Sequence, residues 1–210
     1  MPVQLRFHTG LADVEYVNRE LWHSASLTQC PLHPRGGCSL ASHGSYARKT
    51  PAGTRIARWY CPEGHCTFSL LPDHLAARLP GTLAEIEQAA LAAESAPSLE
   101  ACADALRPEP IGLPGALRWL RRRSDYVRAV LPTVVALLPQ QLQGCAPTIT
   151  AMRRHLGVDQ VLLRVLRAKL AAHLGALASP LGLRHRGAAG DAHGSRSQQH
   201  MGPDPPGCAA

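Results

Sequence analysis

Cysteine and histidine residues gather at two points in one short stretch of this chain. The metal-ligand candidates are Cys30, His33, Cys38, Cys61, His65 and Cys66. Thiolates and imidazoles are ligands that Zn²⁺ prefers. A small β-rich module with few apolar side chains gains much of its folding free energy from such coordination. The pattern predicts a tetrahedral zinc site, and we expect residues 28–72 to form a zinc ribbon.

The first ligand group leaves two alternatives open. Cys30 and His33 have the two-residue gap of a metal knuckle, and Cys38 follows after a flexible stretch that contains Gly36 and Gly37. That stretch can bring Cys38 back toward the metal. Both His33 and Cys38 are therefore candidates.

The second group also offers a choice, between His65 and Cys66. Gly64 stands before them, where a tight turn favours a residue that can take positive φ. Adjacent side chains usually point apart, so we expect only one of the two to reach the metal. The preferred set is Cys30, Cys38 and Cys61 with either His65 or Cys66, and His33 replaces Cys38 if that thiol is free.

Two other interpretations of these residues are structural. Unpaired cysteine is commonly a small core residue, and a lone histidine is more often structural than a ligand. Disulfides are the second alternative, but residues 1–10 lack the apolar run of a secretory signal. We therefore expect a cytoplasmic protein with reduced thiols and no membrane span.

Composition favours helices and an acidic partner. The 210-residue chain is 45% hydrophobic but only 4% aromatic, and Ala and Leu supply most of the apolar content. Its net charge is +7, and 20 of its 22 basic residues are arginine. A positive balance of this kind makes a polyanion the expected partner.

The order of patterns along the chain predicts an α+β fold. Residues 1–27 include an expected short helix over 11–22, and residues 39–48 and 55–60 should pair as a hairpin around the turn residues 50–53. From 73 to 178 the pattern is helical. Helices are expected at 74–79 after Asp73, after Thr82, after Ser98, and at 115–123, 125–138 and 158–177. Residues 179–210 lack an apolar pattern and are expected to be disordered.

Several separated motifs occur together in residues 30–90. They are Cys30-Pro31, His43-Gly44-Ser45-Tyr46-Ala47-Arg48, Arg58-Trp59-Tyr60-Cys61 and Thr67-Phe68-Ser69-Leu70-Leu71-Pro72. This run resembles the zinc-ribbon segment of bacterial proteins associated with insertion sequences and transposases. The resemblance implies a zinc-dependent module that binds nucleic acid. Relatives commonly have a second Cys-x-x-Cys knuckle, whereas position 64 is glycine here.

Basic residues mark the candidate DNA contacts. Residues 98–123 resemble a helix-turn-helix whose second helix is basic, and the ribbon hairpin carries further cations beside aromatic residues. The alternative for the helix is an ordinary solvated helix end. The nucleic-acid-binding candidates are Arg48, Lys49, Arg55, Arg58, Arg118, Arg121, Arg122 and Arg123.

The sequence predicts that the protein is not an enzyme. The helical region is too short for a ribonuclease-H-like domain, which holds two metal ions with three carboxylates. No nucleophile motif surrounds Cys102 or Cys145. The expected function is DNA binding for a mobile element, with a homodimer or a transposase as partner. The alternative is a protein-interaction ribbon whose helices at 125–177 form a dimerisation or partner surface.

Overall fold

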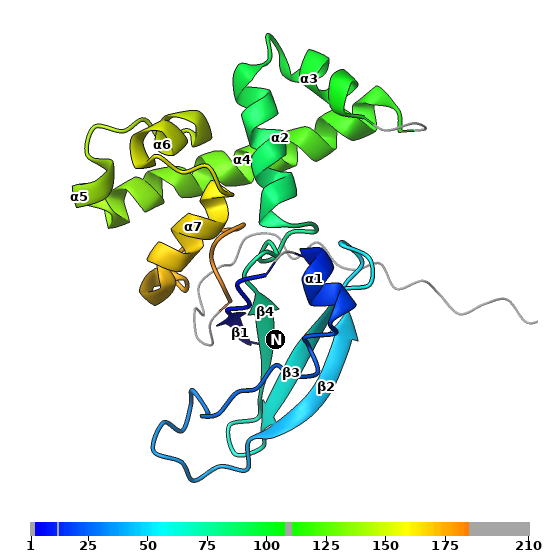
Figure 1. Ribbon diagram of the computed structural model, residues 1–210, viewed down its shortest axis with the longest axis vertical. Helices are drawn as coiled ribbons and strands as arrows, with labels where there is room; N and C mark the ends of the chain where they lie inside the picture. The colour runs from blue at the N-terminus through cyan, green and yellow to red at the C-terminus, as the bar shows by residue number, and fades with distance from the viewer. Residues whose placement is uncertain (1–2, 12, 108–110, 185–210) are drawn as a thin grey trace, which may run out of the picture.

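A four-stranded mixed sheet forms one half of the protein and helices form the other (Figure 1). The structure is a computed structural model, and it describes residues 3–11, 13–107 and 111–184. The strands are β1 (Val3–Phe7), β2 (Ala41–Ala47), β3 (Arg55–Cys61) and β4 (Cys66–Pro72), in the order β1-β4-β3-β2. This α+β class is the one that the sequence predicted.

The predicted hairpin is present as β2 and β3, which pair in antiparallel fashion. The sequence did not predict the other two strands. β4 returns antiparallel to β3 directly after the turn at 62–65, and β1 lies parallel to β4 on the outer edge. β3 is therefore an internal strand, and at its end Cys61 pairs with Cys66 of β4.

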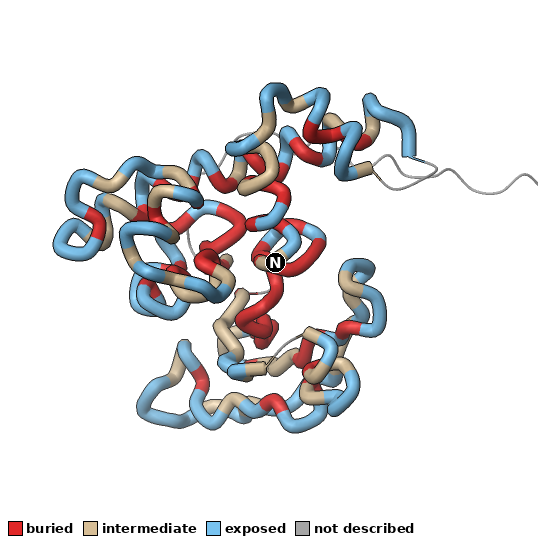
Figure 2. The backbone as a smooth tube through the Cα atoms, turned by 45° about the horizontal axis from the view of Figure 1, so that its top comes forward, coloured by how far each residue is buried: buried red, intermediate tan, exposed pale blue. Residues whose placement is uncertain are grey.

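Each sheet face packs against a different layer. On β3 and β4, Ile56 and Leu71 belong to the large core that the helices share. Their neighbours Ala57 and Leu70 point to the opposite face, as side chains alternate along a strand. There they pack with Tyr16 and other residues of the N-terminal segment. Buried residues are concentrated where the sheet and the helices meet (Figure 2).

The N-terminal helix is shorter than predicted, since α1 covers only Asp13–Asn18.

The predicted helix at 74–79 is absent. That stretch forms turns, and Leu75 bridges to Thr82. Asp73 does not cap a helix there; its buried carboxylate accepts hydrogen bonds from Arg6 at 2.6 Å and from His8 at 2.5 Å.

The capping residues in the sequence correctly predicted where the next two helices begin. α2 (Leu83–Ser95) begins with a capping box, in which Thr82 and Glu85 bond each other's backbone amides. α3 (Leu99–Leu106) begins at Ser98, whose hydroxyl accepts from the amide of Ala101. These side chains satisfy backbone N–H groups that the first turn of a helix leaves unpaired.

The separate helices predicted at 115–123 and 125–138 form one continuous helix, α4 (Leu113–Leu137). Burial explains the continuity, because Arg123, Ser124 and Val127 all lie on its inner face. A short α5 (Pro139–Leu142) follows. The sequence did not predict α6 (Ile149–Leu156), and α7 (Leu162–Lys169) with a 3₁₀ turn (Ala171–His173) occupies part of the predicted 158–177 helix.

Residues 179–184 differ from the expected disordered tail. Leu181 is fully buried and Leu183 is nearly so, and both belong to the main core. A Cβ atom at Gly182 would lie 1.7 Å from the carbonyl oxygen of Leu177, so only glycine fits this tight turn. The rest of the predicted tail, 185–210, lies outside the described residues. Among the described helices, none has both the length and the apolar character needed to cross a lipid bilayer.

Candidate metal centre

Four of the six candidate ligands come together at one end of the sheet. The donor atoms of Cys30, His33, Cys38 and Cys61 all lie within 4.8 Å of one another. Cys30, His33 and Cys38 belong to the loop before β2, and Cys61 is the last residue of β3. This group can hold a metal ion, as the sequence predicted for this segment.

Two separations in the group match those around a tetrahedral ion. Nδ1 of His33 lies 3.5 Å from Sγ of Cys30 and 3.4 Å from Sγ of Cys61. Zinc binds sulfur at about 2.3 Å and imidazole nitrogen at about 2.0–2.1 Å, so tetrahedral geometry predicts an N···S separation of about 3.5 Å. Three thiols and one imidazole are a donor set typical of structural zinc sites. The cluster therefore fits zinc in both distance and chemistry.

Short turns position the ligands of the loop. The amide of His33 donates to the carbonyl of Cys30 at 3.1 Å, which closes the knuckle, and the amide of Gly36 donates to the carbonyl of His33 at 3.0 Å. Gly36 and Gly37 have φ of 82° and 86°, in the left-handed region that glycine occupies at low cost. These two residues reverse the chain and bring Cys38 back to the cluster.

Hydrogen bonds also fix the turn after Cys61. The amide of Gly64 donates to Sγ of Cys61 at 3.3 Å, a bond that stabilises a thiolate. The carboxylate of Glu63 accepts from the amide of Ser39 at 3.0 and 3.1 Å, next to Cys38. Glu63 thereby ties the two ligand-bearing segments together. The sequence analysis did not single it out, although an acid two residues after a candidate ligand was visible.

The pKa values of two thiols in the cluster are shifted in opposite directions. Burial raises the pKa of Cys30, but hydrogen bonds from His33 and from the amides of Leu32 and His33 outweigh it and bring the pKa to about 7. Burial and then the neighbouring thiols Cys30 and Cys61 raise the pKa of Cys38 to about 11. Several thiolates in one place repel one another, and a divalent cation removes that repulsion.

His65 and Cys66 are not part of the four-residue group. His65 is exposed and has a φ of 45°, so it occupies the left-handed turn position that the sequence assigned to Gly64. Cys66 lies opposite Cys61 in the strand register and belongs to the same buried cluster as Cys30, Cys61, Val3 and Phe68. The geometry thus differs from the preferred set, because it includes both His33 and Cys38 and takes its fourth donor from the loop.

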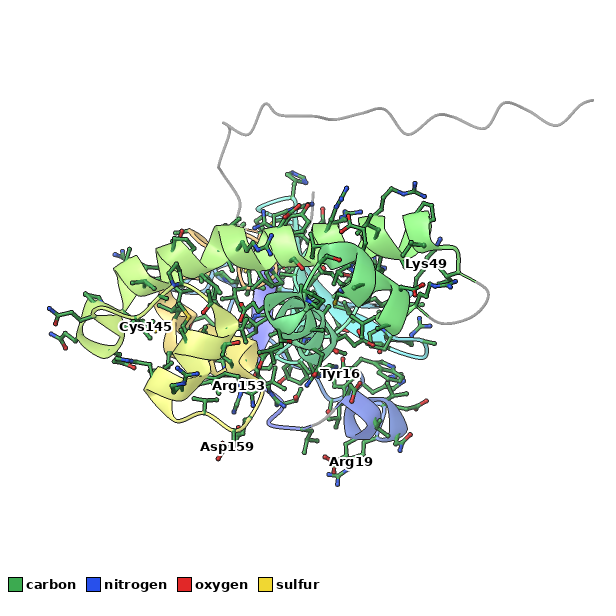
Figure 3. All side chains as sticks on the ribbon, turned by 90° about the horizontal axis from the view of Figure 1, so that it is seen from above. Tyr16, Arg19, Lys49, Cys145, Arg153 and Asp159 are labelled. Carbon is green, nitrogen blue, oxygen red and sulfur yellow. The ribbon has the colours of Figure 1, made fainter. Side chains whose placement is uncertain are left out.

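The ribbon cations that the sequence proposed for nucleic acid differ in availability. Arg48 donates to the carbonyls of Ala76 at 2.8 Å and Thr50 at 3.0 Å, and also to that of Leu79. Its guanidinium therefore holds loops together. Arg55 is exposed and bonds Ser45, and Arg58 lies over the ring of Tyr46. Lys49 is exposed in the turn after β2 (Figure 3).

The four candidate arginines of α4 also differ in whether they are buried or exposed. Arg123 is buried and lies over the ring of Trp119, with 4.1 Å between the guanidinium carbon and the ring centroid. Arg118, Arg121 and Arg122 are exposed on the first half of α4. Arg121 forms a 3.1 Å ion pair with Glu100 of α3. Three of the four helix candidates are thus on the surface.

Cys102 is a described thiol that lies outside residues 28–72. Cys102 is buried between α3 and its neighbours, and burial raises its pKa.

Comparisons with known proteins found no matching family model, no matching curated protein and no matching solved structure. The site is therefore interpreted from its own geometry: an α+β protein with a Cys₃His cluster that can bind a metal ion.

Proposed function

We propose that this protein is a zinc-stabilised DNA-binding protein without a catalytic role. It would serve a mobile genetic element, as the resemblance to transposase-associated zinc ribbons implies. The observation that carries the DNA-binding proposal is the exposed group formed by Arg118, Arg121 and Arg122 on α4. The metal cluster carries the proposal that zinc is structural.

A structural zinc site is supported by the number of donors. Cys30, His33, Cys38 and Cys61 supply four protein ligands, which fill a tetrahedral coordination shell. Catalytic zinc sites keep one position open for water or substrate. Bound zinc would contribute folding free energy by joining the 30–38 loop to the end of β3, in addition to the apolar packing around these residues.

The arginine surface has the chemistry of a phosphate contact. Three exposed guanidinium groups within five residues of one helix can donate paired hydrogen bonds to phosphate oxygens. The ion pair between Arg121 and Glu100 joins two side chains that are each more than half exposed, at 54% and 56%. Such a pair contributes little free energy, so DNA could displace Glu100. α3 packs against the first half of α4, which carries these arginines, as the helix-turn-helix interpretation requires.

On the ribbon, Lys49 and Arg55 are the exposed cations that can add phosphate contacts. Arg48 and Arg123 are engaged inside the protein and are not proposed as DNA contacts. The dimerisation surface considered for 125–177 is not proposed either. Val127, Val130, Leu131 and Val134 of α4 are buried in the protein's own core, together with apolar residues of α6 and α7.

Salt dependence tests the DNA-binding proposal. Affinity of the zinc-loaded protein for a labelled DNA duplex is measured by fluorescence anisotropy over a series of salt concentrations. Counterion release predicts a steep linear fall of log affinity with log salt. The double variant Arg118→Gln/Arg122→Gln should reduce the slope by about 2, since each phosphate contact contributes about 1.

Arg154→Gln is the matched control, because Arg154 is an exposed arginine on α6, away from the proposed contacts. It should leave the slope within experimental error. Equal slopes for the wild-type protein and the double variant would refute the assignment of α4. An affinity indifferent to salt would refute DNA binding itself.

A further inference from the structure

Exposed apolar side chains gather at one place on the surface. The large hydrophobic residues that are exposed in the described part of the chain are Val14, Leu106, Ile111, Leu113 and Trp119. All except Val14 lie where α3 ends and α4 begins. Their exposed fractions range from 37% for Leu113 to 44% for Leu106 and Ile111. Apolar side chains that gather on a surface mark an interaction site more often than singly exposed ones do.

Leu106, Ile111 and Trp119 line a groove of about 310 Å³ between α3 and α4. Its lining consists of Ala103, Leu106, Arg107, Ile111, Gly115, Ala116 and Trp119. Three of these residues are small, and they keep the groove open. At Gly115, a Cβ atom would meet only Ile111, at 3.5 Å. The missing side chain therefore leaves space that an apolar group from another molecule can fill.

Trp119 is held in place although 41% of it is exposed. The buried Arg123 lies over its ring, 4.1 Å from the centroid, and donates to the carbonyl of Trp119 at 3.5 Å. An aromatic ring that is already ordered loses little conformational entropy on binding. Exposed tryptophan beside a pocket is also the residue type most enriched among binding hot spots.

Two arginines of α4 that follow the groove residues carry no ion pair within the described part of the chain. Arg118 and Arg122 lie on the stripe of α4 that continues from Gly115 and Trp119, at helical spacings of three. Neither takes part in an ion pair with another described residue. The acids nearby, Asp104 and Glu100, are each paired, with Arg107 and Arg121 respectively. Two arginines are left without an opposite charge beside an apolar groove.

We propose that this groove binds the apolar face of an acidic amphipathic helix from a partner protein. Such a helix presents apolar anchors at i, i+3 or i+4, and i+7, which fit a groove between two helices. Its acidic residues would face Arg118 and Arg122. A second copy of the chain fits less well, because two-fold pairing of this surface brings the same arginines together. The proposal does not depend on the proposed metal binding. It shares Arg118 and Arg122 with the proposed DNA surface, so DNA and the partner helix would compete for them.

A designed peptide tests the groove directly. The probe is a labelled helical peptide of about 16 residues with leucine on one face and glutamate elsewhere, and the comparison peptide has lysine in place of every glutamate. Binding to the full-length, zinc-loaded protein is followed by anisotropy. We expect the acidic peptide to bind at least about tenfold more tightly than the basic one.

Gly115→Leu is the variant that separates binding from folding. Leucine favours a helix more than glycine does, so the variant should be at least as stable as the wild-type protein. Its side chain would occupy the groove, and we expect affinity for the acidic peptide to fall by about tenfold or more. Trp119→Ala should have a similar effect. Val14→Ala changes an exposed apolar residue on α1 and should leave the affinity unchanged.

Three results would overturn the proposal. One is equal binding of the acidic and basic peptides, and another is undiminished binding to Gly115→Leu. The third is a concentration-dependent dimer, seen by sedimentation, that Gly115→Leu disperses. That last result would assign the groove to a second copy of the chain.

Discussion

The guanidinium of Arg167 donates a hydrogen bond to the backbone carbonyl of Asp73 at 3.1 Å, across 94 positions in the sequence. Further bonds from the same group reach the carbonyls of Leu75, Pro180 and Leu181. Arg167 is only 1% exposed. A single buried side chain therefore joins α7, the end of β4 and the C-terminal part of the described chain.

Removal of this guanidinium should strongly destabilise the protein. Arg167→Met keeps much of the side-chain volume but removes the donor to the buried carbonyl oxygens of Asp73, Leu75 and Leu181, while that of Pro180 keeps its bond from the amide of Ala77. Because an unpaired buried polar group costs about 1–3 kcal/mol, we expect a loss of about 3 kcal/mol or more in the free energy of unfolding. Urea unfolding measures it. Arg154→Met, at an exposed site, should change stability by less than about 0.5 kcal/mol.

Metal content should depend on Cys61 and not on Cys66. Native mass spectrometry of the purified protein should show one zinc ion per chain. Cys61→Ser removes a donor from the four-residue group and should abolish that binding, whereas Cys66→Ser should retain it. His33→Ala and His65→Ala form a second matched pair with the same expectation. Retention of zinc by Cys61→Ser would contradict the ligand set.

Glu63 should strengthen metal binding without touching the ion. Its carboxylate accepts from the amide of Ser39 and so holds the segment that carries Cys38. Supporting residues of this kind typically change metal affinity by about 10–100-fold, and we expect a loss of about tenfold for Glu63→Ala. Competition with a chromophoric chelator measures the affinity. Glu20→Ala serves as the exposed control, and equal affinities for the two variants would argue against this role.

His74 should make the protein less stable in mild acid. It is buried against Tyr16, neither ring nitrogen has a hydrogen-bond partner, and burial lowers its pKa from 6.5 to about 4. A base with a lowered folded-state pKa contributes full stability above the unfolded pKa. That contribution falls as the pH drops from about 6.5 toward 4, since only the unfolded chain takes up the proton.

His74→Leu removes this titration. Between pH 7.5 and pH 5, the stability of the wild-type protein should fall by about 2 kcal/mol relative to the variant. Urea unfolding at both pH values gives the difference. Comparing two proteins at each pH cancels effects that they share, such as protonation of the metal ligands. A constant difference between the proteins would show that His74 does not titrate as inferred.

The sequence predicted those parts of the fold that local chemistry determines. Thr82 and Ser98 mark helix starts because a side-chain oxygen can pair with an amide two or three residues later. The β2–β3 hairpin follows from turn residues between two extended runs. Helices 115–123 and 125–138 were wrongly separated because burial of Arg123 and Ser124 against other elements favours continuity, and no local signal reports it.

For the metal cluster, too, local chemistry determined one part and long-range packing the other. The sequence by itself determined that thiols and imidazoles are grouped between positions 30 and 66 in a chain with a basic balance, because residue type and spacing alone set that chemistry. The tertiary structure decided that His33 and Cys38 both reach Cys30 and Cys61, whereas Cys66 stays outside this group although the strand register pairs it with Cys61. It also decided which arginines face outward. Long-range packing fixes both results, and a linear pattern contains neither.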